Sequence, residues 1–396
     1  MDRYDGERGN GHGERPAGRL KVMAVFGTRP EAVKMAPLVH ELFRHRDEIE
    51  TKVCVTAQHR EMLDQVLDVF RLAPDYDLDL MTPRQKLTDL TIRVISHLSG
   101  VLAKEKPDLV LVHGDTTTTF AAAYTAFLHR LAVGHVEAGL RTWNKLHPFP
   151  EEMNRQLTDV LADLHFAPTR WAADNLRREN KPESSIYITG NTITDVRPYL
   201  VKPGYTHPVL EWARGRRLVL LTAHRQESLG EPHRRIFRAV RRLADEFPDI
   251  AVVYPVHLNP AVRGPAGEIL GGHPRIRLID PLDVVDMYNF YPHVHLILTD
   301  SGGIQEEAPS FGIPTLVLRE TTERPEGIEA GVLALAGTDE ERVYAMTRRL
   351  LTDEAAYAAM RNASNPYGDG RASERIVQAI LHHFGRREHP PEPFGG

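Results

Sequence analysis

The sequence predicts an α/β protein built from two Rossmann-like domains, whose parallel sheets face a central cleft. Short apolar runs recur along the chain, and a stretch with helical periodicity follows each of them. The runs are nearly continuous in aliphatic and β-branched residues, which is typical of strands buried on both faces of a parallel sheet. The length of 396 residues exceeds one ordinary domain and makes two the natural expectation.

The predicted strands fall into two series. The first series occupies residues 21–27, 52–57, 108–114, 132–137, 164–169 and 185–190. The second occupies residues 217–224, 250–256, 276–280, 295–300, 314–319 and 332–337. Strands that alternate with helices in this way indicate parallel βαβ units in each series.

A Pro-rich, irregular segment at Val196–Arg216 interrupts the alternation and predicts a domain boundary. We therefore expect an N-terminal domain at 19–195, a C-terminal domain at 196–370 and a C-terminal segment at 371–396. The helical stretch Ser373–Phe384 in that last segment is expected to cross back onto the first domain.

Composition is that of an ordinary globular protein, with 41% hydrophobic and 26% charged residues and a net charge of −5. The charge gives no sign of a nucleic-acid partner, and no apolar run is long enough to cross a bilayer. Residues 1–18 combine charges and glycines without an apolar core, which favours a disordered extension over a signal peptide. The single cysteine, Cys54, excludes an intramolecular disulfide and fits a cytoplasmic location.

Polar and ionisable residues follow most of the predicted strands. Ligands of open α/β sheets bind beyond the carboxyl ends of the strands, so two such rims facing each other would form an interdomain cleft. The residues at these ends are Thr28, Arg29, Gln58, His59, Asp115 and Glu137 in the first series, and His224, His257, Asp300, Ser301 and Arg319 in the second.

Two cations lie at the start of the first predicted helix, in "FGTRPEAVKMAPLV". Pro30 suits the first helical turn, Arg29 stands beside it and Lys34 lies about one turn further on. Both cations can point at an anion, although a loop arginine and a solvated helix lysine explain the motif equally well. The stretch lacks the GxGxxG pattern and the chain lacks a Walker lysine motif, which disfavours dinucleotide and P-loop sites.

Three carboxylates of the first series are candidates for acid–base chemistry. Asp115 follows a strand and could equally be a helix N-cap. Glu137 ends a buried strand, where burial is expected to raise its pKa toward the range of a general base. Glu151 lies in a first helical turn, which the helix dipole alone would explain, but it is spaced i, i+4 from Arg155 on one face. His135 is expected to be a satisfied core histidine.

The stretch "TDSGGIQEEAPSFGIP" predicts an anion seat at a helix start. Asp300 or Ser301 would cap the helix, and the amides of the two following glycines would be free for an anion. Glu307 lies one turn deeper and could accept hydrogen bonds from sugar hydroxyls, whereas we expect Glu306 to point to solvent. Arg324 adds a cation near the same mouth.

Histidines end two strands of the second series. His224 and His257 would face the cleft, where a histidine can bind a phosphate or transfer a proton. The spacing of histidines and acids includes no HExxH or other metal pattern, so we predict no metal site.

Taken together, these motifs make the chain resemble the non-hydrolysing, bacterial UDP-N-acetylglucosamine 2-epimerases from Lys21 to about Phe384. The resemblance implies a glycosyltransferase-B-like fold, a homodimer and interconversion of UDP-GlcNAc and UDP-ManNAc without a cofactor. It further implies elimination of UDP to a 2-acetamidoglucal, re-addition of UDP, and a supply of ManNAc units for cell-surface polysaccharides. The motifs that carry it are "FGTRPEAVKMAPLV", "TAQHREMLDQV", "VHGDTTTT", "VGHVEAGLRT", "PEEMNRQL", "PVHLNP", "TDSGGIQEEAPS", "TTERPEGIEAG" and "NPYGDGRASERI".

The resemblance also implies roles for single residues. The catalytic set would be Asp115, Glu137, Glu151 and His224. The UDP-sugar would contact Arg29, Lys34, Arg155, Leu282, Met287, Ser301, Gly302, Gly303, Glu307 and Arg324. A second, activating UDP-GlcNAc would bind at Gln58, Glu61, Arg84 and His257, and Glu61 replaces the Gln that some members have.

Three alternatives stay open at this point: a hydrolysing epimerase that releases free ManNAc and UDP, a glycosyltransferase on the same fold, and a catalytically silent UDP-sugar sensor. Against the transferase, two opposed sets of carboxylates fit proton exchange at one sugar carbon, and no acceptor groove is evident from the sequence. The joint presence of three acids and His224 disfavours the sensor.

Overall fold

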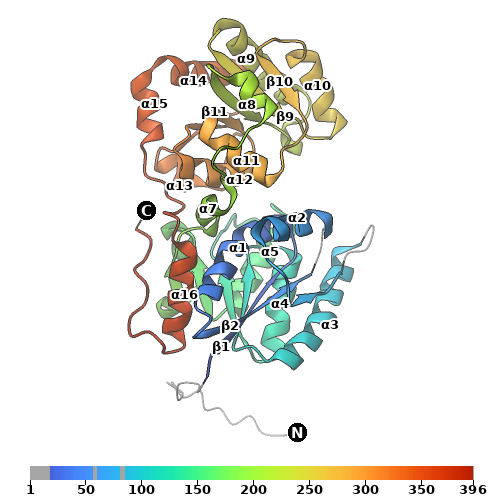
Figure 1. Ribbon diagram of the computed structural model, residues 1–396, viewed down its shortest axis with the longest axis vertical. Helices are drawn as coiled ribbons and strands as arrows, with labels where there is room; N and C mark the ends of the chain where they lie inside the picture. Colours follow the sequence, from blue (N-terminus) through green and yellow to red (C-terminus); the bar gives the residue numbers. More distant parts are fainter. Residues whose placement is uncertain (1–17, 57–59, 81–84, 396) are drawn as a thin grey trace.

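The computed structural model describes residues 18–56, 60–80 and 85–395, with the side chains of 60–62 left out. Two parallel sheets, each covered by helices, lie one above the other along the longest axis of the molecule (Figure 1). The predicted α/β class with two Rossmann-like sheets is confirmed. The helices of the described residues include none that is both long and apolar enough to cross a membrane.

The first sheet has the strand order β3-β2-β1-β4-β5-β6-β7, and all its described pairs are parallel. Each predicted strand of the first series is present, and one further strand, β3, was not predicted because it has only two residues. The strands are β1 (Leu20–Phe26), β2 (Ile49–Val55), β3 (Tyr76–Asp77), β4 (Leu109–His113), β5 (Ala132–Val136), β6 (Leu164–Ala167) and β7 (Ile186–Ile188).

The helices of this half connect successive strands, as parallel pairing requires. They are α1 (Arg29–Arg44), α2 (Arg60–Phe70), α3 (Leu87–Glu105), α4 (Thr117–Leu128), α5 (Glu151–Leu161), α6 (Arg170–Arg178) and the 3₁₀ turn η1 (Glu183–Ser185). Helix α1 begins with a capping box between Thr28 and Glu31, and Pro30 occupies the first turn.

The second sheet repeats the same winding in the order β10-β9-β8-β11-β12-β13. Its strands are β8 (Arg217–Thr222), β9 (Ile250–Pro255), β10 (Ile276–Ile279), β11 (Val294–Thr299), β12 (Thr315–Val317) and β13 (Leu333–Leu335). Its helices are α8 (Pro208–Ala213), η3 (Gln226–Ser228), α9 (Glu231–Glu246), α10 (Pro260–Leu270), α11 (Val284–Phe290), η4 (Tyr291–His293), α12 (Gly302–Glu307), η5 (Ala308–Phe311), α13 (Pro325–Glu329), α14 (Glu340–Thr352) and α15 (Glu354–Arg361).

The chain crosses between the two halves twice, and the crossings are bound to each other. The first crossing contains η2 (Thr192–Asp195) and α7 (Arg197–Leu200), and the second leads into α16 (Ala372–His383), which packs beside α1 (Figure 1). The Asp195 carboxylate accepts hydrogen bonds from the backbone amides of Ala372 and Ser373 at 3.1 and 2.6 Å. The domain limits at 195/196 and 370/371 remain our prediction.

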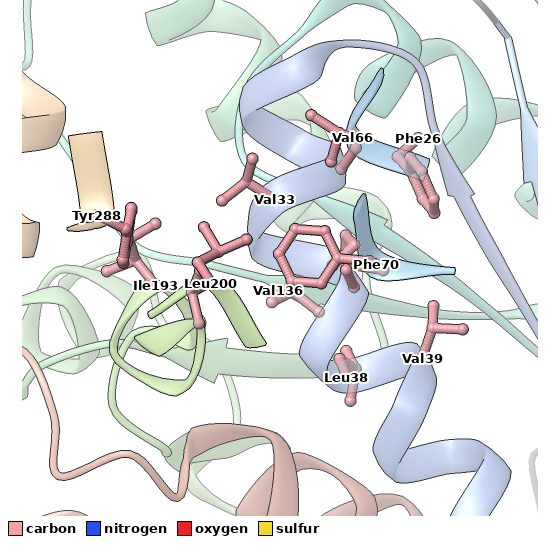
Figure 2. Close-up of a cluster of buried hydrophobic side chains, with 14 of the residues drawn as sticks. Phe26, Val33, Leu38, Val39, Val66, Phe70, Val136, Ile193, Leu200 and Tyr288 are labelled. Carbon is pink, nitrogen blue, oxygen red and sulfur yellow. The ribbon is translucent and has the colours of Figure 1, made fainter. Parts of the chain in front are cut away.

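Apolar packing is continuous across the junction of the two halves. One cluster of buried side chains contains strand residues of both sheets, and Figure 2 shows part of it, with Val33 of α1, Ile193 and Leu200 of the first crossing and Tyr288 of α11. A junction of this kind can hold the carboxyl edges of both sheets close to each other.

Strand order decides where a ligand can bind. The order reverses between β1 and β4 in the first sheet and between β8 and β11 in the second. A crevice opens beyond the strands at such a switch point, because the helices on its two sides run to opposite faces of the sheet. The chain segments directly after these four strands contain Arg29, Asp115, His224 and Ser301, so both switch points carry predicted site residues.

Candidate functional site

A cleft of about 500 Å³ lies between the two switch points. Both halves line it: the start of α1 and Ile193 of the first crossing contribute on one side, and the ends of β8 and β9 with α11 and α12 on the other. The predicted residues among its lining are Arg29, Lys34, His224, His257, Leu282, Met287, Ser301, Gly303, Glu307 and Arg324.

A buried ion-pair network bridges the two halves at the floor of this cleft. Lys34 of α1 donates to the carboxylate of Glu137 and, at 2.9 Å, to that of Glu306 on α12. Arg324 donates to the same Glu306 carboxylate at 2.8 and 2.9 Å. Burial alone would lower the pKa of Lys34, but its two carboxylate partners outweigh burial and raise it.

Glu306 overturns one expectation from the sequence. Its side chain is 4% exposed and pairs with both Lys34 and Arg324, whereas we expected it to point to solvent. The helical position one residue before Glu307 was the basis of that expectation. The error arose because α12 is buried on more than one side, since the other half of the molecule supplies Lys34.

Glu137 is positioned by an uncommon backbone conformation. It follows β5 with a φ of 66°, a left-handed value that aims the side chain away from the strand direction. Its carboxylate also accepts a hydrogen bond from Asn191 at 2.8 Å. Burial raises the pKa of Glu137, as we expected, but Lys34 and the nearby His113 outweigh burial and lower it to about 2. The prediction of a raised pKa was therefore wrong.

His113, the last residue of β4, was not singled out from the sequence. It is 4% exposed, and neither ring nitrogen has a hydrogen-bond partner among the described residues. Its Nε2 lies 3.8 Å from the Glu137 carboxylate, and burial lowers the pKa of the imidazole to about 4. His113 is therefore a neutral group beside Glu137 at neutral pH.

Asp115 does not cap helix α4, although capping was the simplest explanation for an aspartate at this position. Thr116 is the N-cap of α4 and accepts from the amide of Thr119, while the Asp115 carboxylate pairs with Arg155 at 3.2 Å. Burial raises the pKa of Asp115, and Arg155 opposes that effect. Such a carboxyl can exchange a proton closer to neutral pH than an ordinary aspartate can.

Arg155 does not pair with the Glu151 carboxylate, although the i, i+4 spacing had suggested such a pair. It reaches Asp115, Glu152 at 3.6 Å and only the backbone oxygen of Glu151 at 3.4 Å. Glu151 stays half-buried at the start of α5, where its negative charge contributes to the raised pKa of Asp115. The two acids therefore lie near each other on the same side of the molecule.

The helix start at Ser301 matches an anion seat in part. Ser301 is the N-cap of α12, but its hydroxyl makes no capping hydrogen bond. A Cβ placed on Gly302 would lie 3.2 Å from the Arg324 guanidinium, so glycine lets this cation approach the helix start. Gly303 lines the cleft beside it. The seat combines the Ser301 hydroxyl, which makes no capping hydrogen bond, with the guanidinium of Arg324.

Glu307 lies deeper in the same wall. Its carboxylate accepts a hydrogen bond of 2.5 Å from the Tyr291 hydroxyl, and burial raises its pKa. Leu282 and Met287 are half-buried in the wall formed by α11 and the loop before it. His135 is fully buried between Asp159 and the Gly114 carbonyl, at 2.6 and 2.7 Å, as expected for a core histidine.

Most of the predicted second ligand site lies outside the described residues. Gln58 and Arg84 lie outside the described residues, and so does the side chain of Glu61. His257 is described: it is exposed, lines the cleft, and stacks on His224 with the ring centroids 5.6 Å apart. Within the described part of the chain, no three His, Cys, Asp or Glu side chains group as metal ligands would.

Comparison with known proteins places the chain in a family. The family model described as UDP-N-acetylglucosamine 2-epimerase matches residues 41–381. The UDP-N-acetylglucosamine 2-epimerase of Bacillus subtilis is 58% identical over 378 residues, which cover 96% of this chain and 99% of that protein. The chain belongs to this family. It is the bacterial, non-hydrolysing type, and the enzyme is an isomerase.

Solved structures of the family agree with the fold. The structure of a Listeria monocytogenes relative is 52% identical and has a TM-score of 0.91, covering 95% of this chain and 99% of that one. A Neisseria meningitidis UDP-GlcNAc 2-epimerase is 46% identical with a TM-score of 0.83, covering 92% of this chain and 100% of that one. The glycosyltransferase-B-like arrangement expected for the epimerase is thus confirmed.

Two buried acids of the epimerase hold the site in shape and were missed from the sequence. Glu31, 3% exposed, accepts from the amides of Gly27 and Thr28 and from the hydroxyl of Thr116, which ties the ends of β1 and β4 together. Glu152, fully buried, accepts from the amides of Thr142 and Trp143. The acidic first turn of each helix was visible in the sequence, but the distant loops that these acids bind were not.

Proposed function

We propose that the enzyme interconverts UDP-GlcNAc and UDP-ManNAc by eliminating UDP and adding it back. The observation that carries this proposal is the network through Lys34, which joins a carboxylate of the first half to the cation-lined helix start of the second. A reaction that moves a proton at one sugar carbon while a diphosphate leaves the next carbon requires these two functions side by side.

The reaction moves one proton at C2 and one leaving group at C1. A carboxylate takes the C2 proton, and the electron pair of that C–H bond forms the C1–C2 double bond. The C1–O bond to UDP breaks, and UDP leaves with its electron pair as an anion beside 2-acetamidoglucal. A proton then returns to C2 on the opposite face, and UDP re-forms its bond to C1. Asp115, Glu137 and Glu151 supply these proton transfers in the proposal.

The second half, together with two cations of α1 from the first half, would hold the nucleotide. Arg29, Lys34 and Arg324 with the amides of Gly302 and Gly303 would receive the diphosphate, because cations and N–H groups stabilise a departing anion. Glu307 would accept hydrogen bonds from the ribose hydroxyls, and Leu282 and Met287 would contact the uracil. Arg155 would hold Asp115 in place at the sugar, and His224 would face the diphosphate.

Two relatives support the choice of ligand. The Neisseria meningitidis enzyme was solved bound to UDP-GlcNAc, and a Staphylococcus aureus relative was solved with UDP. The product would supply ManNAc units to cell-surface polysaccharides. A cytoplasmic location remains part of the proposal and rests on a composition with one buried cysteine.

Proton exchange at C2 tests the proposal directly. We expect UDP-GlcNAc incubated with the enzyme in D₂O to give UDP-ManNAc that carries deuterium at C2, followed by NMR. Free ManNAc would indicate the hydrolysing reaction, and an unchanged substrate would refute the proposed activity. A second pair of reactions starts from UDP-ManNAc, one with added UDP-GlcNAc and one without it, and tests the second ligand site. If UDP-GlcNAc activates the enzyme, the reaction without it shows a lag or a lower rate.

We further propose that the enzyme is a homodimer. An apolar patch, the α4–α5 face, exposes Tyr124, Phe127, Leu128, Leu157 and Val160, with Phe127 and Val160 at 55% and 67% exposure. Helices α4 and α5 pack beside each other, so these exposed side chains lie on two neighbouring helices. A contiguous apolar patch of large side chains is typical of an interface, and a second copy of the chain covers it symmetrically.

Phe127→Asp is expected to convert the dimer to a monomer, because it places a charge in the middle of a dry apolar surface. Sedimentation equilibrium would give 44.6 kDa for the variant and twice that mass for the wild type. Phe43→Asp is the control. Phe43 lies on α1 and is 41% exposed, and this variant should stay dimeric. A monomeric wild type, or an unchanged mass of the Phe127 variant, contradicts this interface.

A further inference from the structure

A buried carboxylate, Asp300, lies directly behind His224. It follows β11 and is fully buried, with 0% exposure. One carboxylate oxygen, Oδ2, accepts the backbone amides of His224 and Arg225 at 2.6 and 2.7 Å. The loop after β8 is thereby fastened to the end of the neighbouring strand β11, at the switch point of the second sheet.

The other carboxylate oxygen faces the imidazole of His224. Oδ1 of Asp300 lies 3.4 Å from Nδ1 of His224 and has no hydrogen-bond partner among the described residues. The ring of His224 stacks on His257, 12° from parallel, and both histidines line the cleft. A buried carboxylate oxygen without a donor is costly, so an N–H on Nδ1 that points toward it is favoured.

Helix capping does not account for Asp300. The N-cap of α12 is Ser301, and the Asp300 carboxylate turns back toward β8 instead. A second histidine, His233 of α9, approaches from the protein interior, with its Nε2 3.9 Å from Oδ2. His233 is fully buried, and neither of its ring nitrogens makes a hydrogen bond within the described part of the chain. The carboxylate therefore lies between one histidine of the cleft and one of the core.

We propose that Asp300 is a positioning residue that fixes His224 with Nδ1–H toward the carboxylate and Nε2 toward the cleft. The role of Asp300 in turnover rests on the proposed function. The Nε2 lone pair can then take up a proton, and the resulting imidazolium, with Asp300 as its counter-charge, donates that proton in a hydrogen bond to the departing diphosphate. An aspartate behind a histidine acts in this way in other enzymes, by setting the tautomer without itself taking the proton.

The charged and titratable groups around His224 set the direction of its pH dependence. Burial lowers the pKa of His224, Asp300 opposes that effect, and His257, Arg225 and His233 lower the pKa further. Since Asp300 is the group that raises it, removal of its charge moves the titration of His224 to lower pH. The imidazolium is then present at a smaller fraction at any given pH.

The tautomer of His224 is measurable in the intact wild-type enzyme. Protein labelled with ¹⁵N-histidine gives distinct NMR shifts for protonated and unprotonated ring nitrogens, and the signal missing from His224→Gln assigns the pair. We expect the neutral ring to carry its proton on Nδ1. A neutral ring protonated on Nε2 would overturn the proposal. This measurement requires no turnover, so it decides the proposal even if the enzyme proves inactive on UDP-GlcNAc.

The Asp300→Asn variant extends the test to function. We expect its His224 to titrate at lower pH and its kcat to fall by about 100-fold, in the range of a lost acid–base or orienting group. Asp245→Asn is the matched control, since Asp245 also contacts a histidine, His273, at 3.1 Å, and neither residue lines the cleft. A folded Asp300→Asn variant with wild-type kcat and an unchanged His224 titration would refute the proposal. If that variant does not fold, the wild-type tautomer decides.

Discussion

Lys34→Met is expected to lower the free energy of unfolding by about 3–5 kcal/mol, because it removes one partner of a buried ion pair and leaves the other charged. The side chains of Lys34, Glu137 and Glu306 are 11%, 11% and 4% exposed. Methionine keeps most of the volume of lysine but offers no N–H, so two carboxylates would remain buried without their shared cation. Urea denaturation followed by circular dichroism measures the loss.

The same variant is expected to bind UDP much more weakly. Lys34 lines the cleft beside Arg324 and the helix start at Ser301, where the diphosphate is proposed to lie. A double variant, Lys34→Met with Glu137→Gln, separates the two effects, since it removes the carboxylate that loses its lysine partner, whereas Glu306 keeps Arg324. We expect it to regain part of the stability but none of the UDP affinity, measured by calorimetry.

Lys21→Met is the control for the loss of an ordinary lysine ion pair. Lys21 of β1 pairs with Glu105 at 3.2 Å, and its side chain is 27% exposed, so its removal should cost no more than about 1 kcal/mol. If Lys34→Met costs as little as Lys21→Met, the bridge between the two halves does not stabilise the enzyme. Unchanged UDP affinity would remove Lys34 from the proposed diphosphate site.

The sequence predicted the strands and their polar ends well because both are local. A run such as residues 108–114 needs no partner to be recognised, and Asp115 follows it wherever the strand lies in the sheet. Strand order is not local: it depends on which face each connecting helix covers, so the switch points became visible only in the structure. The switch points in turn locate the cleft, which Lys34, His224 and Arg324 line.

The errors concern charge, and they share one physical cause. The pKa of Glu137 and the burial of Glu306 are both set by Lys34, which is 103 and 272 residues away in sequence. Asp300 was considered as a cap from its place before a helix, yet its partners His224 and Arg225 lie on another strand end. Sequence reasoning can weigh burial and helix position, but a pKa depends on the nearest opposite charge, which only the fold supplies.

Glu137→Gln is expected to lower the rate of epimerisation and of deuterium uptake at C2 by at least about 100-fold, the usual contribution of a positioned general base. Glutamine matches glutamate in size and can keep a hydrogen bond with Asn191, but its amide cannot accept the C2 proton. UDP binding should persist, because Lys34 retains Glu306 and Arg324 is untouched. Single-turnover rates and UDP calorimetry on the same preparation measure both quantities.

The low pKa of Glu137 sharpens this expectation. The Lys34 cation helps hold that pKa at about 2, so Glu137 is ionised throughout the neutral range and its titration should not limit kcat/KM there. A diphosphate that draws Lys34 away removes the charge that stabilised the carboxylate, and the pKa of Glu137 then rises toward that of a useful base. Glu179→Gln, which loses an ion pair with Arg141 away from the cleft lining, is the control and should keep wild-type turnover. A Glu137→Gln variant that exchanges C2 deuterium at the control's rate would assign the base to Asp115 or Glu151 instead.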